Sequence, residues 1–131
     1  MEKPRCVVLP TCLPYKNVAT RSIRFVEDVL TVEVQGEGFV WLHVVFREVI
    51  GFRALDERDL CEFWNEYSTP NGWLYEVSEG GWMDLEKQRR WFSSPEIFGD
   101  LREYLLVDDV CVSVLCRATP VLESLGASPR G

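Results

Sequence analysis

Short runs of alternating apolar and polar residues are the feature that most constrains what this chain can fold into. Residues 30–34 read LTVEV and residues 110–114 read VCVSV, with leucine or valine at every second position. Because successive side chains of a β-strand point to opposite faces, such runs bury one face and expose the other. Seventeen valines against four alanines also favour sheets over helix bundles. We therefore expect a chain that is mostly sheet, with Val110, Val112 and Val114 facing the core.

Acidic turns join these runs into two hairpins. The first spans residues 23–34 and turns at Glu27-Asp28. The second spans residues 103–115 and turns at Asp108-Asp109, where acidic residues tolerate the backbone of a tight turn. The sequence therefore predicts two antiparallel strand pairs, and it interprets Asp108-Asp109 as a turn rather than as a calcium site.

Three further segments are assigned by composition. Residues 39–46 are apolar on both faces, which predicts a central strand that continues to Phe52 with a bulge at Gly51. Residues 1–20 contain three prolines and are expected to form an extended arm that includes an edge strand. Residues 123–131 are small and polar, so we expect a frayed tail.

One segment has the pattern of a helix. Asp56 is a suitable N-cap, and Leu55 is placed to pack against Leu60 as a hydrophobic staple. Apolar residues then follow at helical spacing until a proline and a glycine end the pattern. We expect the main helix to run from about Glu57 to Glu66, with its apolar side on the sheet.

Residues 82–92 fit two structures. As a strand, Trp82–Glu86 pairs back on residues 73–77 across a turn at 78–81, which brings Trp73 and Trp82 close together. The apolar residues of this segment also fit the helical period of 3.6 residues. Both alternatives remain open from the sequence alone.

Together these patterns predict one α+β domain that covers residues 1–131. It has a mainly antiparallel sheet of about seven strands, strongly twisted or partly closed, with one main helix packed on it. A chain of 131 residues buries enough surface to fold in this way without disulfides.

Charge and cysteine content exclude several classes of protein. The net charge of −7 repels phosphate backbones, so no nucleic-acid partner is expected. We expect no membrane-spanning segment and no export signal, because no apolar run is long enough. The five cysteines are an odd set without Cys-x-x-Cys pairs, which predicts reduced thiols in the cytoplasm, no metal and no cofactor.

Few residues are candidates for chemistry. The single histidine, His43, lies within an apolar run and is expected to be a hydrogen-bonded strand residue. On a strand, Asp84 and Glu86 share one face beside Trp82, a geometry that glycosidases use, although surface acids paired with nearby cations explain the same residues. Trp73 and Trp82 are candidate anchors of an interface, because tryptophan is enriched in binding hot spots.

Residues 72–82, GWLYEVSEGGW, and residues 103–115, EYLLVDDVCVSVL, resemble small bacterial proteins. Some of those proteins are similar to immunity proteins of toxin systems. The resemblance implies a stoichiometric protein binder without catalysis, and it assigns no role to any single residue.

Three hypotheses for function follow. The leading one is a non-catalytic module that binds a basic partner protein, with Trp73, Trp82, Asp84 and Glu86 as candidate binding residues. The alternative is a half-barrel that holds a small apolar ligand between sheet and helix, and the third is a small hydrolase that uses paired carboxylates. An interface requires exposed aromatic residues on an acidic face, whereas a ligand site requires them around a void.

Overall fold

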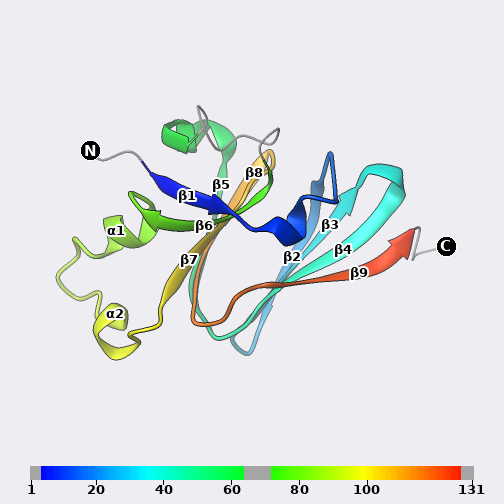
Figure 1. Ribbon diagram of the computed structural model, residues 1–131. Coiled ribbons are helices and arrows are strands. Elements are labelled where there is room, and N and C mark those ends of the chain that lie inside the picture. The colour runs from blue at the N-terminus through cyan, green and yellow to red at the C-terminus, as the bar shows by residue number, and fades with distance from the viewer. Residues whose placement is uncertain (1–3, 64–71, 128–131) are drawn as a thin grey trace.

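Nine strands in two antiparallel sheets make up most of the computed structural model, which describes residues 4–63 and 72–127 (Figure 1). The five-stranded sheet has the order β1 (Arg5–Val8), β6 (Leu74–Glu79), β7 (Arg102–Leu106), β8 (Val110–Cys116), β5 (Val49–Asp56). The four-stranded sheet has the order β2 (Ala19–Val26), β3 (Val29–Gly36), β4 (Val40–Phe46), β9 (Val121–Ala127). The predicted mainly antiparallel architecture is confirmed, but the strands form two sheets instead of one sheet of about seven.

The helices of the described residues are short. Three are 3-10 helices, η1 (Pro10–Cys12), η2 (Glu37–Phe39) and η3 (Glu57–Phe63), and two are α-helices, α1 (Trp82–Glu86) and α2 (Ser94–Ile97). None of these helices, nor any other among the described residues, is long and apolar enough to cross a membrane.

The two sheets pack face to face around the main core. Leu30, Val32 and Val34 of β3 are fully buried, as their alternation predicts. The rings of Phe46 on β4 and Tyr104 on β7 lie 6.2 Å apart and join the two layers. Burying each side chain of this size contributes about 1.5–3 kcal/mol, so the packing between the sheets dominates the stability of the fold.

The chain changes sheet immediately after β4, where a single strand to Phe52 was expected. β4 ends at Phe46, Glu48 turns the backbone with a φ of 55°, and β5 then joins the other sheet. The expected bulge at Gly51 is confirmed, since the register between β5 and β8 shifts between Val49 and Gly51. The prediction of one strand was wrong because the residues before and after the turn are both apolar, so the sequence pattern does not reveal the turn.

Both predicted hairpins are confirmed. Glu27 and Asp28 have φ values of 47° and 66°, as a two-residue turn that matches the twist of the strands requires. β7 and β8 pair as the second hairpin. Val112 and Val114 are fully buried, but Val110 is 41% exposed because it pairs with Asp56 at the outer end of edge strand β5.

The two ends of the chain differ from each other. The expected edge strand in the N-terminal arm is confirmed as β1, which pairs with β6 at the side of the five-stranded sheet. The expected frayed tail is wrong for residues 123–127, which belong to β9 and pair with β4. Pairing with a buried strand overrides their small, polar composition, and residues 128–131 lie outside the described residues.

The predicted main helix is only partly confirmed. Residues 57–63 form the 3-10 helix η3, which is kinked at Leu60 (φ −127°, ψ 38°), and residues 64–66 lie outside the described residues. Asp56 ends β5, and its Oδ1 accepts a hydrogen bond from the Arg58 N–H at 2.9 Å, which is the expected capping interaction. Leu60 is 2% exposed and packs with Leu55 on the outer face of the five-stranded sheet.

Residues 82–86 form helix α1, so the hairpin alternative is wrong and the helical one is confirmed for this stretch. Trp73 and Trp82 consequently do not pair across a turn. Trp73 belongs to the core between the sheets, whereas the ring of Trp82 lies over Gly51 and Arg53 on the outer face.

Candidate functional site

A cleft of about 570 Å³ opens at one end of the sandwich. It lies where the β7–β8 turn, the start of η3 and the chain between η1 and β2 meet. We call it the acidic cleft, and the residues that line it are Leu13, Tyr15, Lys16, Asn17, Val18, Glu57, Gly72, Trp73, Asp108 and Asp109. It therefore combines three carboxylates and one cation, Lys16, with an apolar wall.

Backbone hydrogen bonds fix the positions of the acids. Asp108 Oδ2 accepts a hydrogen bond from the Thr20 N–H at 2.7 Å, which ties the β7–β8 turn to β2. The Glu57 N–H donates to the carbonyl oxygen of Asp109 at 3.0 Å, which ties the same turn to η3. Segments far apart in the sequence thus hold their carboxylates around one cleft.

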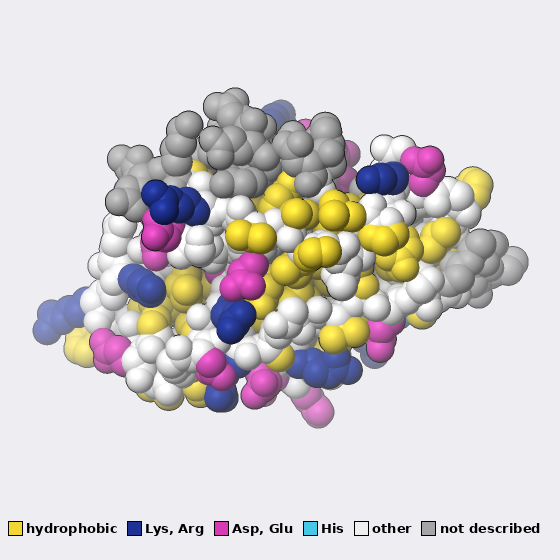
Figure 2. All heavy atoms as spheres, viewed as in Figure 1, with side chains coloured by type: hydrophobic (Ala, Val, Ile, Leu, Met, Phe, Trp, Pro, Cys, Tyr) yellow, Lys and Arg dark blue, Asp and Glu magenta, His cyan; other side chains and the backbone are white. Residues whose placement is uncertain are grey.

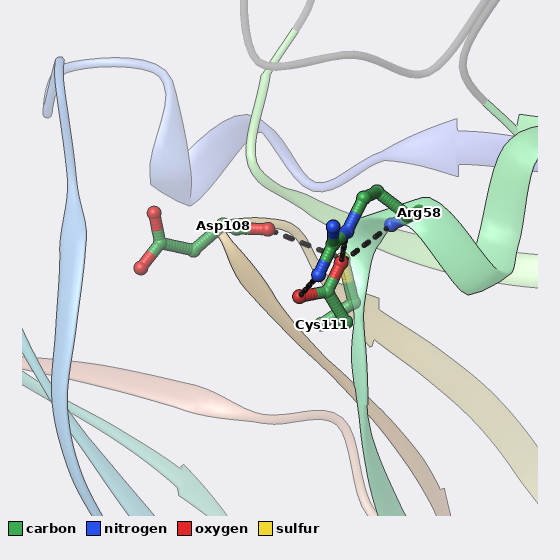
Figure 3. A network of polar contacts seen from close by, with 4 residues as sticks. Arg58, Asp108 and Cys111 are labelled. Carbon is green, nitrogen blue, oxygen red and sulfur yellow. Dashed lines mark hydrogen bonds and ion pairs between the residues drawn. The ribbon is translucent and has the colours of Figure 1, made fainter.

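The nearby arginine is engaged with a different carboxylate. Arg58 Nε donates to Asp56 Oδ1 at 2.9 Å, and Nη2 donates to Oδ2 at 3.2 Å. The pKa of Asp56 lies below its usual value because of these hydrogen bonds from Arg58. Figure 3 shows the carboxylate of Asp108 pointing away from this pair. Arg58 therefore pairs with Asp56, and the carboxylate of Asp108 points away from that pair.

The acids act together on the buried thiol beneath them. Burial raises the pKa of Cys111 to about 11, and the carboxylates of Glu57, Asp108 and Asp56 act in the same direction. The thiol donates to the carbonyl oxygen of Asp108 at 3.3 Å (Figure 3). The charges of these three acids thus oppose the loss of a proton from Cys111.

The apolar wall of the cleft is held by Trp73. Its side chain is 4% exposed, and Nε1 lies 3.0 Å from the carbonyl oxygens of both Cys12 and Tyr15, so that one N–H is shared between them. These bonds position the segment that carries Leu13, which is 40% exposed. Trp73 therefore supports the wall from within the core and does not present its ring as an exposed anchor.

An apolar surface continues beside the wall. Figure 2 shows hydrophobic side chains gathered on the face where η1 and β9 lie toward the viewer. Leu13, which lines the cleft, is 40% exposed. The cleft thus has exposed apolar surface as well as carboxylates.

The other predicted site residues lie outside this cleft, on α1. Asp84 Oδ2 accepts from the Gly80 N–H at 2.7 Å, and Glu86 Oε2 accepts from Arg89 Nε at 2.7 Å. The expected common strand face of Asp84 and Glu86 is wrong, because residues two apart on a helix point in different directions. Their pairing with neighbouring groups agrees with the simpler interpretation of surface acids.

A third carboxylate near α1 is buried. Glu103 of β7 is 2% exposed and accepts hydrogen bonds from the N–H groups of Trp82 at 2.9 Å and Met83 at 2.8 Å. Burial raises the pKa of Glu103, while these two hydrogen bonds and the charge of Arg53 lower it. Glu103 thus satisfies the first N–H groups of α1 and fastens this helix to the sheet.

His43 is a hydrogen-bonded strand histidine, as expected. Its Nε2 lies 3.2 Å from Glu33 Oε2 of the neighbouring strand β3, on the outer face of the four-stranded sheet. Within residues 4–63 and 72–127, no three His, Cys, Asp or Glu side chains group closely enough to hold a metal ion.

Comparison of the chain with known protein families, characterised proteins and solved structures found no match. The function must therefore be inferred from the acidic cleft itself. Sequence reasoning missed Glu57, Asp108 and Asp109 as site residues. The available signal was a turn made of two adjacent acids, where Asn-Gly is the more favourable pair.

Proposed function

We propose that this protein is a non-catalytic binding module whose acidic cleft receives a basic segment of a partner protein. The observation that carries this proposal is the gathering of Glu57, Asp108 and Asp109 around one cleft, which the side chains of Leu13 and Tyr15 also line. A lysine or arginine side chain with a neighbouring apolar residue matches both sides of such a cleft.

The charge of the whole chain supports the same partner. A net charge of −7 attracts cationic proteins over distances set by salt, about 10 Å at 0.1 M ionic strength. Asp108 is already oriented by the Thr20 N–H, so little ordering is needed when a cation arrives. Association should therefore be fast at low salt and should slow as salt is added.

The other two hypotheses have less support. Leu60 of η3 is buried in one cluster with Tyr75 and Leu105 of the five-stranded sheet, so an apolar ligand between this helix and the sheet must displace them. Asp84 and Glu86 are each paired separately, which gives a hydrolase no common pair of carboxylates. The resemblance to immunity proteins supplies a narrower hypothesis, in which the basic partner is a toxin encoded beside this protein.

The experiment uses synthetic peptides that contain arginine and tryptophan, with peptides of the same composition but glutamate for arginine as the negative control. Binding is measured by fluorescence anisotropy at low and at physiological salt. In the test variant, Asp108→Asn is combined with Asp109→Asn, and the asparagine at 108 keeps an acceptor for the Thr20 N–H. In the matched control, Glu96→Gln is combined with Glu123→Gln, which removes the same charge from exposed positions outside the cleft.

The cleft variant should bind the basic peptide up to about tenfold more weakly, because each exposed ion pair contributes about 0.2–1 kcal/mol. The control variant should lose only the small part of its affinity for the basic peptide that depends on net charge. Equal losses in both variants, or binding that does not respond to salt, would reject the cleft as the site.

A further inference from the structure

Residues 82–101, which we call the arm, connect β6 to β7 and carry both α-helices. The first turn of the arm is fastened to the sheet, since Trp82 N–H and Met83 N–H both donate to Glu103. Figure 1 shows the loop between α1 and α2 extending away from both sheets. The part of this loop at residues 87–92, KQRRWF, is the tip of the arm.

The tip presents an aromatic ring to solvent. Trp91 is 79% exposed, the highest exposure among the large hydrophobic side chains of the described residues. The guanidinium of Arg90 lies 4.9 Å from the centroid of its ring, a stacked arrangement that keeps the ring and the charge together. Exposed tryptophan and arginine are the residues most enriched in binding hot spots.

The charge of the tip is opposite to that of the protein. Residues 87–92 contain three cations and no acid, although the whole chain carries a net charge of −7. Arg89 is paired with Glu86 at 2.7 Å, which leaves Arg90 as the most available cation. Lys87 lies 3.9 Å from Asp84, and Arg90 is the cation that stacks on Trp91. The tip thus has the basic and aromatic character that the acidic cleft accepts.

In a single molecule these two surfaces lie apart. The arm enters β7 at Arg102, and the acidic cleft begins beyond the other end of that strand, at Asp108. The five residues of β7 separate them by about 16 Å, and the tip extends away from the sheet (Figure 1). The acidic cleft of another copy offers the tip a surface of complementary charge.

We propose that the tip of one copy binds in the acidic cleft of a second copy. This inference rests on the proposed function, in which the cleft accepts a basic and aromatic segment. Arg90 pairs with Asp108 and Asp109, and Trp91 packs on the apolar wall at Leu13 and Tyr15. Because the two surfaces differ, the contact is head-to-tail and leaves a free tip and a free cleft at the ends of each assembly.

Sedimentation velocity of the full chain over a range of concentrations tests the contact. The wild-type protein should form dimers and longer assemblies that dissociate as salt is raised. Trp91→Ala should raise the dissociation constant at least about tenfold, and separately Asp108→Asn combined with Asp109→Asn should raise it by up to about tenfold. Ile97→Ala is the matched control, since Ile97 is 67% exposed on the same arm but lies outside the tip. Circular dichroism establishes that each variant is folded.

Mixing the two impaired variants isolates the contact. The Trp91→Ala protein has an intact cleft and the cleft variant has an intact tip, so an equal mixture should give heterodimers that grow no further. A wild-type protein that stays monomeric, a mixture that stays monomeric, or self-association that survives the cleft substitutions would each overturn the proposal. Basic peptide that binds to a monomeric wild-type protein would uphold the proposed function while rejecting self-association.

Discussion

Gly81 lies where the arm approaches the sheet most closely, and replacing it by alanine tests how the arm is fastened. A Cβ at this position would lie 2.5 Å from Glu103 Oε2 and 2.7 Å from Val77 Cγ1. Real Cβ atoms do not approach other heavy atoms so closely, so something has to move. The φ of Gly81 is −102°, which any residue adopts, and the effect is therefore purely steric.

The cost follows from the two atoms involved. Val77 is 4% exposed and belongs to the same buried cluster as Leu60, on the outer face of the five-stranded sheet. Glu103 is held by two backbone N–H groups. Neither has free space to retreat into, so Gly81→Ala should cost about 1–3 kcal/mol, as overpacking does. For 131 residues the melting temperature falls by about 4 °C per kcal/mol, which predicts a decrease of about 4–11 °C.

Urea denaturation followed by tryptophan fluorescence measures the change in unfolding free energy. Gly99→Ala is the matched control, because a Cβ there meets no atom within 4 Å. Val77→Ala removes the clashing methyl group and leaves the two carboxylate oxygens of Glu103, so Gly81→Ala should cost less in that background than in the wild type. A Gly81→Ala protein as stable as the Gly99→Ala protein would refute the close approach of arm and sheet.

Three further results are expected. Leu60→Ala should lower the unfolding free energy by about 2–5 kcal/mol in urea titrations, because this side chain is 2% exposed, and a neutral effect would contradict its burial. Burial raises the pKa of Glu103 above its ordinary 4.5. Its contribution to stability is therefore full below pH 4.5 and is lost as the pH rises through the pKa of the folded state. Glu103→Gln should abolish this decline in denaturation curves measured from about pH 4 to 8. Burial also raises the pKa of Cys111 to about 11 and of Cys116 to about 12, so iodoacetamide at about pH 8 should modify them only after unfolding, as mass spectrometry will show.

The strand pairings that sequence reasoning located are those between strands that follow each other along the chain. The alternation at residues 30–34 and the turn at Glu27-Asp28 are local signals, and the hairpin of β2 and β3 follows from them. Pairing of β9 with β4 joins residues about 80 positions apart, and nothing in the composition of residues 121–127 signals it. Glu48 turns the chain with a positive φ, and the sequence has no glycine or asparagine at this position that would have predicted the turn.

The candidate site was hidden for the same reason. Asp108 and Asp109 were correctly placed in a turn, but Glu57 and the chain around Tyr15 reach that turn only through the order of the sheets. Trp73 lines the cleft, but its ring is buried and its N–H holds the wall in place. Sequence alone supplies the types of residue, and the distant pairings decide which of them meet.

Stability and binding place opposite demands on the acids of the cleft. The sandwich is closed by the core between its sheets, and the β7–β8 turn needs only residues that tolerate a turn. Glu57, Asp108 and Asp109 carry like charges around one cleft, which attracts a cation and adds nothing to the packing of the core. Asp108→Asn combined with Asp109→Asn should therefore leave the unfolding free energy equal or higher while it weakens peptide binding. If urea denaturation instead shows a large loss of stability, the carboxylates serve the fold, and their gathering no longer argues for a binding site.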